Sequence, residues 1–247
     1  MKPILFYLGS SPVYSYPLLM GIGWGMAYNL SIQQWQKFGL NTISLQLFTF
    51  LSFLIGWIGA KVFFLIFSTP DQVLYYAKEV NFWLGGGFVF YGGFVFVLLF
   101  ALLYFYKKKD LSISDLGLLI PGITIGHAIG RVGCFLAGCC YGSETQSVFS
   151  IHSNGHDRYP VQLIEAVGLF IIYVISKKLL NKERGRERAA LVYLIGYSLL
   201  RFFNEFLRGD EIRGLYSGLA TSQWISLVII GVTLVIVMMR KAIEGKS

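Results

Sequence analysis

The stretch LATSQWISLVIIGVTLVIVMM, residues 219–239, contains no charged side chain. The stretch LGGGFVFYGGFVFVLLFALLYFY, residues 84–106, contains none either. A helix needs about 20 mostly apolar residues to cross the hydrocarbon core of a bilayer, so each stretch can form one transmembrane helix. Five more apolar segments are found at 13–30, 43–67, 112–138, 161–180 and 189–207. We therefore predict an all-α integral membrane protein, a bundle of about seven transmembrane helices that form a single domain over residues 1–247.

The composition of the whole chain supports this prediction. Of 247 residues, 55% are hydrophobic and only 14% are charged, whereas a soluble domain carries about 25% charged residues. An aromatic content of 17% excludes a disordered chain. The net charge of +8 resides in short clusters between apolar segments, which indicates membrane topology rather than nucleic-acid binding.

Lysines and arginines are unevenly distributed between the predicted connections. With the N-terminus outside, thirteen lie on the inner side and five on the outer side. The positive-inside rule then predicts an external N-terminus and a cytoplasmic C-terminus, with the connections 139–160 and 208–214 outside. We see no small-residue cleavage site after the first apolar segment, so we expect this segment to be retained.

Charged side chains inside the predicted helices are the first candidates for a functional site, because each costs roughly 2.5–3.5 kcal/mol to place at the bilayer centre. Tyr197, Arg201 and Glu205 recur at intervals of four and share one helix face, which Arg208 extends. Arg201 and Glu205 can pair along the helix. The set is either a functional site or an ion pair that fixes helix packing.

The run GHAIGRVGCFLAGCCYG, residues 126–142, places His127 and Arg131 four residues apart among glycines. A buried guanidinium needs an anionic partner, and lipid phosphate is the most available one in a membrane. We expect His127 to be a packing residue. In the fifth segment, Gln162 and Glu165 share a face, and Glu165 either pairs with an arginine or extends to the membrane surface.

Three further features leave more than one interpretation open. Cys134, Cys139 and Cys140 do not have a standard zinc spacing, so they are packing residues or redox or nucleophilic groups. Lys61 either faces a pore or extends to a helix end. Tyr91 lies in a glycine-rich run that suits tight helix packing or phosphate binding.

Several of these motifs, in this order, resemble the bacterial prolipoprotein diacylglyceryl transferase family over nearly the whole chain. They are SYPLLMGIG, VFYGG, GRVGCFLAGCCYG, RYPVQLIE, YSLLRFFNEFLR and SQWISL. The resemblance implies that the diacylglyceryl group of phosphatidylglycerol is transferred to the lipobox cysteine thiol of a prolipoprotein signal peptide. A thioether forms and glycerol phosphate is released. The resemblance implies no cofactor, no metal and no nucleic-acid partner. It also implies an enzyme of the bacterial cytoplasmic membrane that contacts membrane lipids and whose active site faces the outer leaflet.

The resemblance also assigns residues. It implies catalytic roles for Arg131, Arg201, Tyr91, Tyr197 and Glu205. It implies phosphatidylglycerol-binding roles for Arg131, Arg201, Tyr16, Gly92, Gly142, Gln162 and Glu165. We expect the two arginines to hold the lipid phosphate, with Glu205 orienting Arg201 and the tyrosines donating hydrogen bonds.

The sequence departs from the family pattern at several positions. Tyr91 replaces a histidine, so that histidine is not present here as a general base, and Lys61 replaces an arginine. Cys134, Ala137 and Cys139 replace two asparagines and a glutamate. These departures leave open an alternative, a related transferase that passes a lipid moiety to a different acceptor. A small membrane transporter is a second alternative, although we see no internal repeat.

Overall fold

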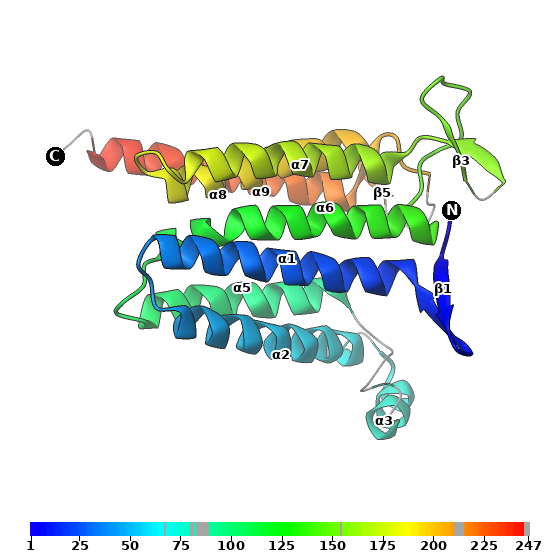
Figure 1. The fold of residues 1–247 in the computed structure, drawn as a ribbon, viewed down its shortest axis with the longest axis horizontal. Coiled ribbons are helices and arrows are strands. Elements are labelled where there is room, and N and C mark those ends of the chain that lie inside the picture. The colour runs from blue at the N-terminus through cyan, green and yellow to red at the C-terminus, as the bar shows by residue number, and fades with distance from the viewer. Residues whose placement is uncertain (67, 80–81, 83–88, 154, 210–214, 245–247) are drawn as a thin grey trace. The chain divides into compact units, whose positions relative to one another are not determined.

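A computed structural model describes residues 1–66, 68–79, 82, 89–153, 155–209 and 215–244, with the side chains of Ala77, Phe90, Tyr91, Ile243 and Glu244 excepted. The described chain is mostly helical (Figure 1). The helices are α1 (Ser15–Lys37), α2 (Thr42–Ile66), α3 (Pro70–Lys78), α5 (Phe90–Lys107), α6 (Ile120–Ala137), α7 (Val161–Leu179), α8 (Gly185–Glu205) and α9 (Thr221–Glu244). A 3-10 helix, Ile113–Leu119, leads into α6.

The chain divides into two compact units. Unit 1 contains Met1–Gln34 and Leu116–Ser247, and unit 2 contains Trp35–Asp115. In unit 1, α6 packs on α7, α7 on α8, and α8 on α9. Because successive helices are neighbours, residues from three different helices can meet in the interior of unit 1.

Small residues bring α1 and α6 together in unit 1. A Cβ atom added to Gly126 would lie only 2.8 Å from the carbonyl oxygen of Gly23, and one added to Gly23 would lie 2.9 Å from that of Gly126. Helix backbones approach this closely only where side chains are absent. The glycines of α6 therefore serve helix packing at this contact.

Three short antiparallel hairpins complete unit 1, and the prediction of an all-α chain did not include them. They are β1 (Ile4–Leu8) with β2 (Ser11–Tyr14), β3 (Ile151–Ser153) with β4 (His156–Arg158), and β5 (Leu215–Tyr216) with β6 (Leu219–Ala220). The last pair turns at Ser217 and Gly218, which both have positive φ, as a two-residue hairpin requires. The hairpins lie at one end of the helices of unit 1 (Figure 1).

Unit 2 has an aromatic interior between α2 and α5. The ring of Phe48 stacks on Phe100 at 5.7 Å and meets the edge of Phe105 at 5.3 Å. Tyr104 donates a hydrogen bond of 2.8 Å to the carbonyl oxygen of Ser44. A Cβ atom on Gly93 would lie 2.9 Å from the carbonyl oxygen of Gly56, so the two helices also make a close backbone contact.

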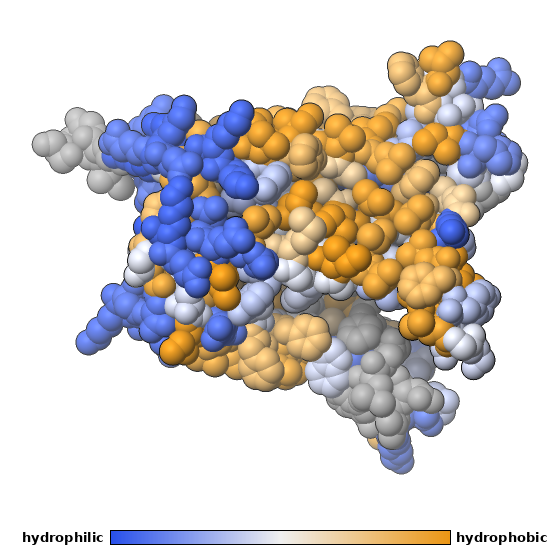
Figure 2. Space-filling model, viewed as in Figure 1, coloured by the Kyte–Doolittle hydropathy of each residue, from blue (hydrophilic) through white to orange (hydrophobic). Residues whose placement is uncertain are grey.

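Three helical segments of the described chain are long and apolar enough to cross a membrane: Thr42–Ile66, Ile113–Ala137 and Thr221–Ala242. Only 17% of the apolar window is buried in the first and third, against 61% in the second. Apolar side chains left exposed in this way suit a lipid environment. Figure 2 shows hydrophobic residues along the middle of the unit 1 helices and hydrophilic residues toward their ends. The chain is therefore a membrane protein.

The other four predicted segments correspond to α1, α5, α7 and α8, and their crossing of the membrane stays a prediction. The start of the first segment differs from expectation. The first segment, expected from residue 13, begins as helix at Ser15 because β2 uses residues up to Tyr14. Residues 84–88 of the third predicted segment lie outside the described residues, and α3 was not predicted.

Candidate functional site

Glu165 lies at the centre of a polar cluster inside unit 1. It sits just over one turn into α7, which begins at Val161 after Pro160. Its side chain is only 1% exposed. The structure therefore favours the first of its two interpretations, a pairing role, over an extension to the membrane surface.

Side chains from two neighbouring helices bind the first oxygen of Glu165. Arg131, on α6, places Nη2 2.8 Å from Oε1. Tyr197, on α8, donates its hydroxyl to the same oxygen at 2.9 Å. One carboxylate thus ties three helices together at a single point.

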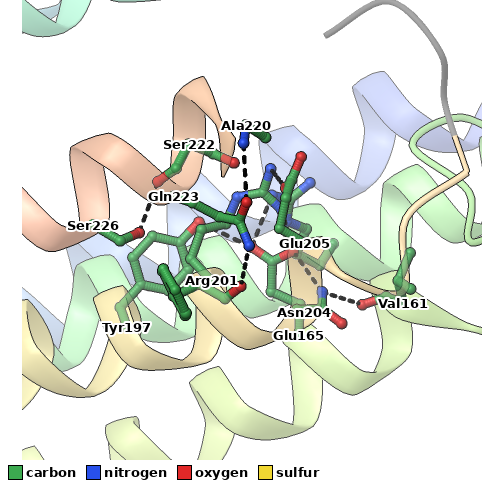
Figure 3. A network of polar contacts seen from close by, with 12 residues as sticks. Val161, Glu165, Tyr197, Arg201, Asn204, Glu205, Ala220, Ser222, Gln223 and Ser226 are labelled. Carbon is green, nitrogen blue, oxygen red and sulfur yellow. Dashed lines mark hydrogen bonds and ion pairs between the residues drawn. The ribbon is translucent and has the colours of Figure 1, made fainter. Parts of the chain in front are cut away.

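The second oxygen of Glu165 faces the last turns of α8 (Figure 3). Asn204 Nδ2 lies 3.4 Å from Oε2 and donates a shorter hydrogen bond of 3.0 Å to the carbonyl oxygen of Val161. Arg201 Nη1 lies 3.8 Å from Oε2, and Arg201 Nη2 pairs with Glu205 Oε2 at 2.6 Å. The predicted pairing of Arg201 with Glu205 along the helix is confirmed.

The two carboxylates of the cluster are more deeply buried than its two guanidiniums. The side chains of Glu165 and Glu205 are 1% and 5% exposed, whereas those of Arg131 and Arg201 are 15% and 13% exposed. Two nitrogens, Arg131 Nε and Arg201 Nη1, are buried without a hydrogen-bond acceptor. Because buried donors are nearly always satisfied, these two indicate a missing acceptor. The carboxylates balance the arginine charges, and one nitrogen of each guanidinium stays without a hydrogen-bond acceptor.

Aromatic rings flank this cluster on one side. The ring of His127 lies 4.8 Å from that of Tyr197, and Tyr193 stacks on Tyr197 at 5.8 Å. The rings restrict the orientation of the Tyr197 hydroxyl toward Glu165. This contact is consistent with the expectation that His127 is a packing residue.

Gly142 and Gln162 lie where the connection after α6 meets the ends of α7 and α8. Gly142 forms a β-bridge with Arg208, and a Cβ atom there would collide with the Tyr159 carbonyl oxygen. Gln162 donates a hydrogen bond of 2.7 Å to the carbonyl oxygen of Cys139. Both residues therefore fix the backbone of the connection that begins at residue 138.

The three cysteines lie together at the start of this connection. Their Sγ atoms are all within 4.8 Å of one another. A hydrogen bond with the Cys134 thiol, helped by the nearby Arg208, lowers the pKa of the Cys140 thiol to about 5, although its burial acts in the opposite direction.

The remaining predicted residues lie in several places. Tyr16, in the first turn of α1, is 40% exposed and borders Gly133 of α6. Gly92 lies in α5, where a Cβ atom would collide with the carbonyl oxygen of Gly59 in α2. Tyr91 begins the same helix, and its side chain lies outside the described residues. The Lys61 side chain is buried, and its ammonium donates to the Phe82 carbonyl oxygen and lies over the Phe82 ring.

Sequence reasoning missed Asn204 and Tyr193 as members of the cluster. Asn204 is three residues from Arg201, so helical spacing gave a signal that could have found it. Tyr193 continues the interval of four that ends at Glu205. Both residues extend the polar face that was predicted on this helix.

The sequence that builds this cluster matches a known family. A family model described as prolipoprotein diacylglyceryl transferase matches residues 3–239. The chain belongs to this family. The prediction of a transferase of lipoprotein biosynthesis is thereby confirmed, and the transporter alternative is not supported.

Individual members of the prolipoprotein diacylglyceryl transferase family resemble the chain over most of its length. The phosphatidylglycerol–prolipoprotein diacylglyceryl transferase 2 of Clostridium perfringens is 34% identical over 242 residues, which cover 93% of this chain and 92% of that protein. The phosphatidylglycerol–prolipoprotein diacylglyceryl transferase of Clostridium tetani is 32% identical, over 94% of this chain and 96% of that protein. The enzyme of that name in Methylobacillus flagellatus is 32% identical, over 97% of both chains.

Proposed function

We propose that the chain transfers the diacylglyceryl group of phosphatidylglycerol to the lipobox cysteine thiol of a prolipoprotein. The observation that carries this proposal is the pair of guanidiniums held against buried carboxylates, with Arg131 Nε and Arg201 Nη1 left without acceptors. A lipid phosphate supplies oxygens that accept from such a pair. The family membership and the names of the relatives support the same reaction.

The reaction is a displacement at a glycerol carbon. The bond from the acceptor sulfur to this carbon forms as the bond from the carbon to the phosphate oxygen breaks. The leaving glycerol phosphate takes the bonding electrons, and the thiol proton passes to solvent or to this phosphate. Arg131 and Arg201 bind the phosphate first and then stabilise the charge that develops on it. This electrostatic stabilisation is stronger in a site of low dielectric than in water.

Glu165, Tyr197 and Glu205 position the arginines. Glu165 receives Arg131 and Tyr197 on one oxygen, and Glu205 holds Arg201 at 2.6 Å. A guanidinium fixed on one edge presents its other edge in one direction, and this lowers the reorganisation needed when charge develops. Arg131, Arg201 and Arg208 also bring positive charge that favours the thiolate form of an incoming cysteine.

The proposal includes the position of the enzyme in the cell. The chain crosses the bacterial cytoplasmic membrane seven times as one domain, with the N-terminus and the hairpins outside and the site toward the outer leaflet. The excess of lysine and arginine in the connections on the other side supports this orientation. Phosphatidylglycerol binds with Tyr16, Gly142 and Gln162 near its head group, whereas the proposed roles of Tyr91 and Gly92 rest on the resemblance of the sequence alone.

Reconstitution tests the proposal directly. The purified chain is placed in bilayers that contain phosphatidylglycerol, a lipobox peptide is added, and mass spectrometry follows the diacylglyceryl adduct on the peptide. We expect an adduct with the cysteine peptide and none with its serine analogue. Replacing Arg131 or Arg201 by Gln lowers the rate by about 10²- to 10³-fold, as loss of one transition-state donor does.

Arg240→Gln is the matched control. Arg240 pairs with Glu187 and is 57% exposed, so its loss removes a charge outside the Glu165 cluster and leaves the rate unchanged. An adduct formed equally well by R131Q and R201Q would contradict the proposed site. No adduct from folded parent protein, beside an active relative, would assign a different donor or acceptor.

A further inference from the structure

The three cysteines of the chain form a compact group of thiols at the carboxyl end of α6. Cys134 is buried inside the helix end, Cys140 is half-buried and Cys139 is exposed. Their Sγ atoms all lie within 4.8 Å of one another. The group thus has a closed side, formed by the helix, and an open side at Cys139.

The fold of the helix end explains why three residues with an unusual spacing meet. Gly138 ends α6 in the left-handed conformation, with φ of 75°. The Cys139 N–H then donates back to the Cys134 carbonyl oxygen at 3.2 Å, the reversed bond of a Schellman motif. Cys140 also has a positive φ of 56°, which is uncommon for a residue with a side chain. The chain turns back on itself and brings both thiols beside Cys134.

The turn is held in place from outside. Gln162, at the start of α7, donates to the Cys139 carbonyl oxygen at 2.7 Å. Gly142 is fixed by its bridge to Arg208 just after the cysteines. A group of thiols that is held on both sides of the turn has its donor atoms in place before a ligand arrives.

The dimensions suit a soft divalent cation. A zinc–sulfur bond of about 2.3 Å places thiolates around one ion roughly 4 Å apart. Small side-chain rotations bring sulfur atoms that lie within 4.8 Å to this separation. Three protein ligands with a fourth position open are the arrangement of catalytic rather than structural zinc sites.

The charges nearby also suit such an ion. Three thiolates and one divalent cation have a net charge of −1, and the positive charges of Arg131 and Arg208 both act on Cys140. The two arginines therefore balance the negative charge of the complex at a place where the complex is partly buried. Gln162, one of the proposed phosphatidylglycerol-binding residues, donates to the Cys139 carbonyl oxygen at 2.7 Å, which places the thiols beside that proposed site.

We propose that Cys134, Cys139 and Cys140 bind one thiophilic divalent cation of the zinc class, whose open coordination position receives the acceptor thiol. The second half of this proposal rests on the proposed function, since the acceptor there is a cysteine. A bound ion would act as a Lewis acid that favours the thiolate form of the acceptor, whose proton would pass to solvent. The acceptor sulfur would then attack the glycerol carbon as the phosphate leaves with the bonding electrons. This differs from the expectation that no metal takes part.

Cobalt(II) is the probe for the metal site, because its thiolate complexes absorb by charge transfer. Full-length protein is reduced, freed of metal with a chelator, and titrated with cobalt in detergent. We expect one equivalent to produce the absorption, and zinc to abolish it by displacement. Each single Cys→Ser variant weakens cobalt binding at least tenfold.

The paired variant H152A/H156A is the control, because these exposed histidines with Asp157 and Glu144 are the nearest rival donors on the connection. It binds cobalt as the parent does. Thermal unfolding of each variant separates loss of ligands from loss of fold. Absence of the one-equivalent absorption from reduced, folded parent protein would overturn the site, as would a disulfide between these cysteines that persists after reduction.

The acceptor half has its own test. A lipobox peptide should change the cobalt spectrum of the parent protein, and its serine analogue should not. Full transfer by a folded triple Cys→Ser variant would overturn the role of the metal and leave the proposed function standing. Cobalt binding by a parent protein that forms no adduct would instead contradict the proposed function and leave the metal site standing.

Discussion

The interior of α6, α7 and α8 and the interior of α2 and α5 use buried charge in different ways. In the first, Glu165 collects Arg131, Tyr197 and Arg201 from two other helices. In the second, Lys61 contacts a backbone carbonyl and aromatic rings, amid the aromatic packing of Phe48 and its neighbours. A cluster of opposite charges with buried donors that lack an acceptor is the feature on which the proposed binding of a lipid phosphate rests. These contacts of Lys61 lie within unit 2, where they join α2 to Phe82.

The largest effect is expected from Glu165→Gln. The amide cannot balance Arg131, and breaking a buried pair by removing one partner costs about 3–5 kcal/mol. We expect transfer to fall more than 100-fold and the thermal unfolding temperature to drop. Glu165→Asp keeps the charge and serves as the partial rescue. Parental activity in E165Q would show that the cluster is packing alone.

Tyr197→Phe should have the next largest effect, because it removes one hydrogen bond to Glu165 and keeps the ring that packs on His127 and Tyr193. A hydrogen bond to a charged group contributes about 1.5–3 kcal/mol. We expect the rate constant for transfer to fall by roughly tenfold or more, with little change in the unfolding temperature. Tyr193→Phe, whose ring stacks without a described bond to Glu165, is the matched comparison and should change the rate far less. Equal rates for the two variants would remove Tyr197 from the positioning group.

Gly126→Ala tests the packing that supports the polar interior. The added methyl group meets the Gly23 carbonyl oxygen across the α1–α6 contact, whereas nothing lies within 4 Å of a Cβ atom on Gly21. We expect an overpacking cost of about 1–3 kcal/mol for G126A and a lower unfolding temperature, with G21A unchanged. The thermal scan in detergent checks both. A stable G126A protein would mean that the two helices are free to separate.

Lys61→Met should have the smallest effect on transfer. Methionine is similar in length to lysine and removes a charge that is costly to bury. We expect transfer within about threefold of the parent rate, since this side chain holds unit 2 in the account given above. A loss as large as that of E165Q would place Lys61 in the reaction and remove the distinction between the two interiors.

Much of the helix pattern was predictable because it depends on local sequence. Long apolar segments gave the positions of α2, α5 and α9, and the spacing of four gave the Arg201–Glu205 pair. The hairpins were missed because their strands contain only two to five residues each, too short for an alternating pattern to stand out.

The centre of the site could not be read from local spacing. Glu165 meets residues 34 positions before it and 32 after it, through helix packing that the sequence does not reveal without a structure. The spacing of the cysteines likewise did not show that their three Sγ atoms gather within 4.8 Å, because the left-handed turn at Gly138 reverses the chain within one residue. Distance along the chain predicts neighbours within a helix and fails where a helix ends.

The central claim is that Glu165 holds two arginines whose remaining donors bind the lipid phosphate. The most direct measurement is calorimetric titration of the purified protein with short-chain phosphatidylglycerol, beside the matching diacylglycerol that lacks the phosphate. The account predicts that the parent binds the phosphatidylglycerol and that R201Q and E165Q bind it at least tenfold more weakly, while the weak affinity for the diacylglycerol is the same in all three. Equal affinity of the parent and R201Q for phosphatidylglycerol would contradict it.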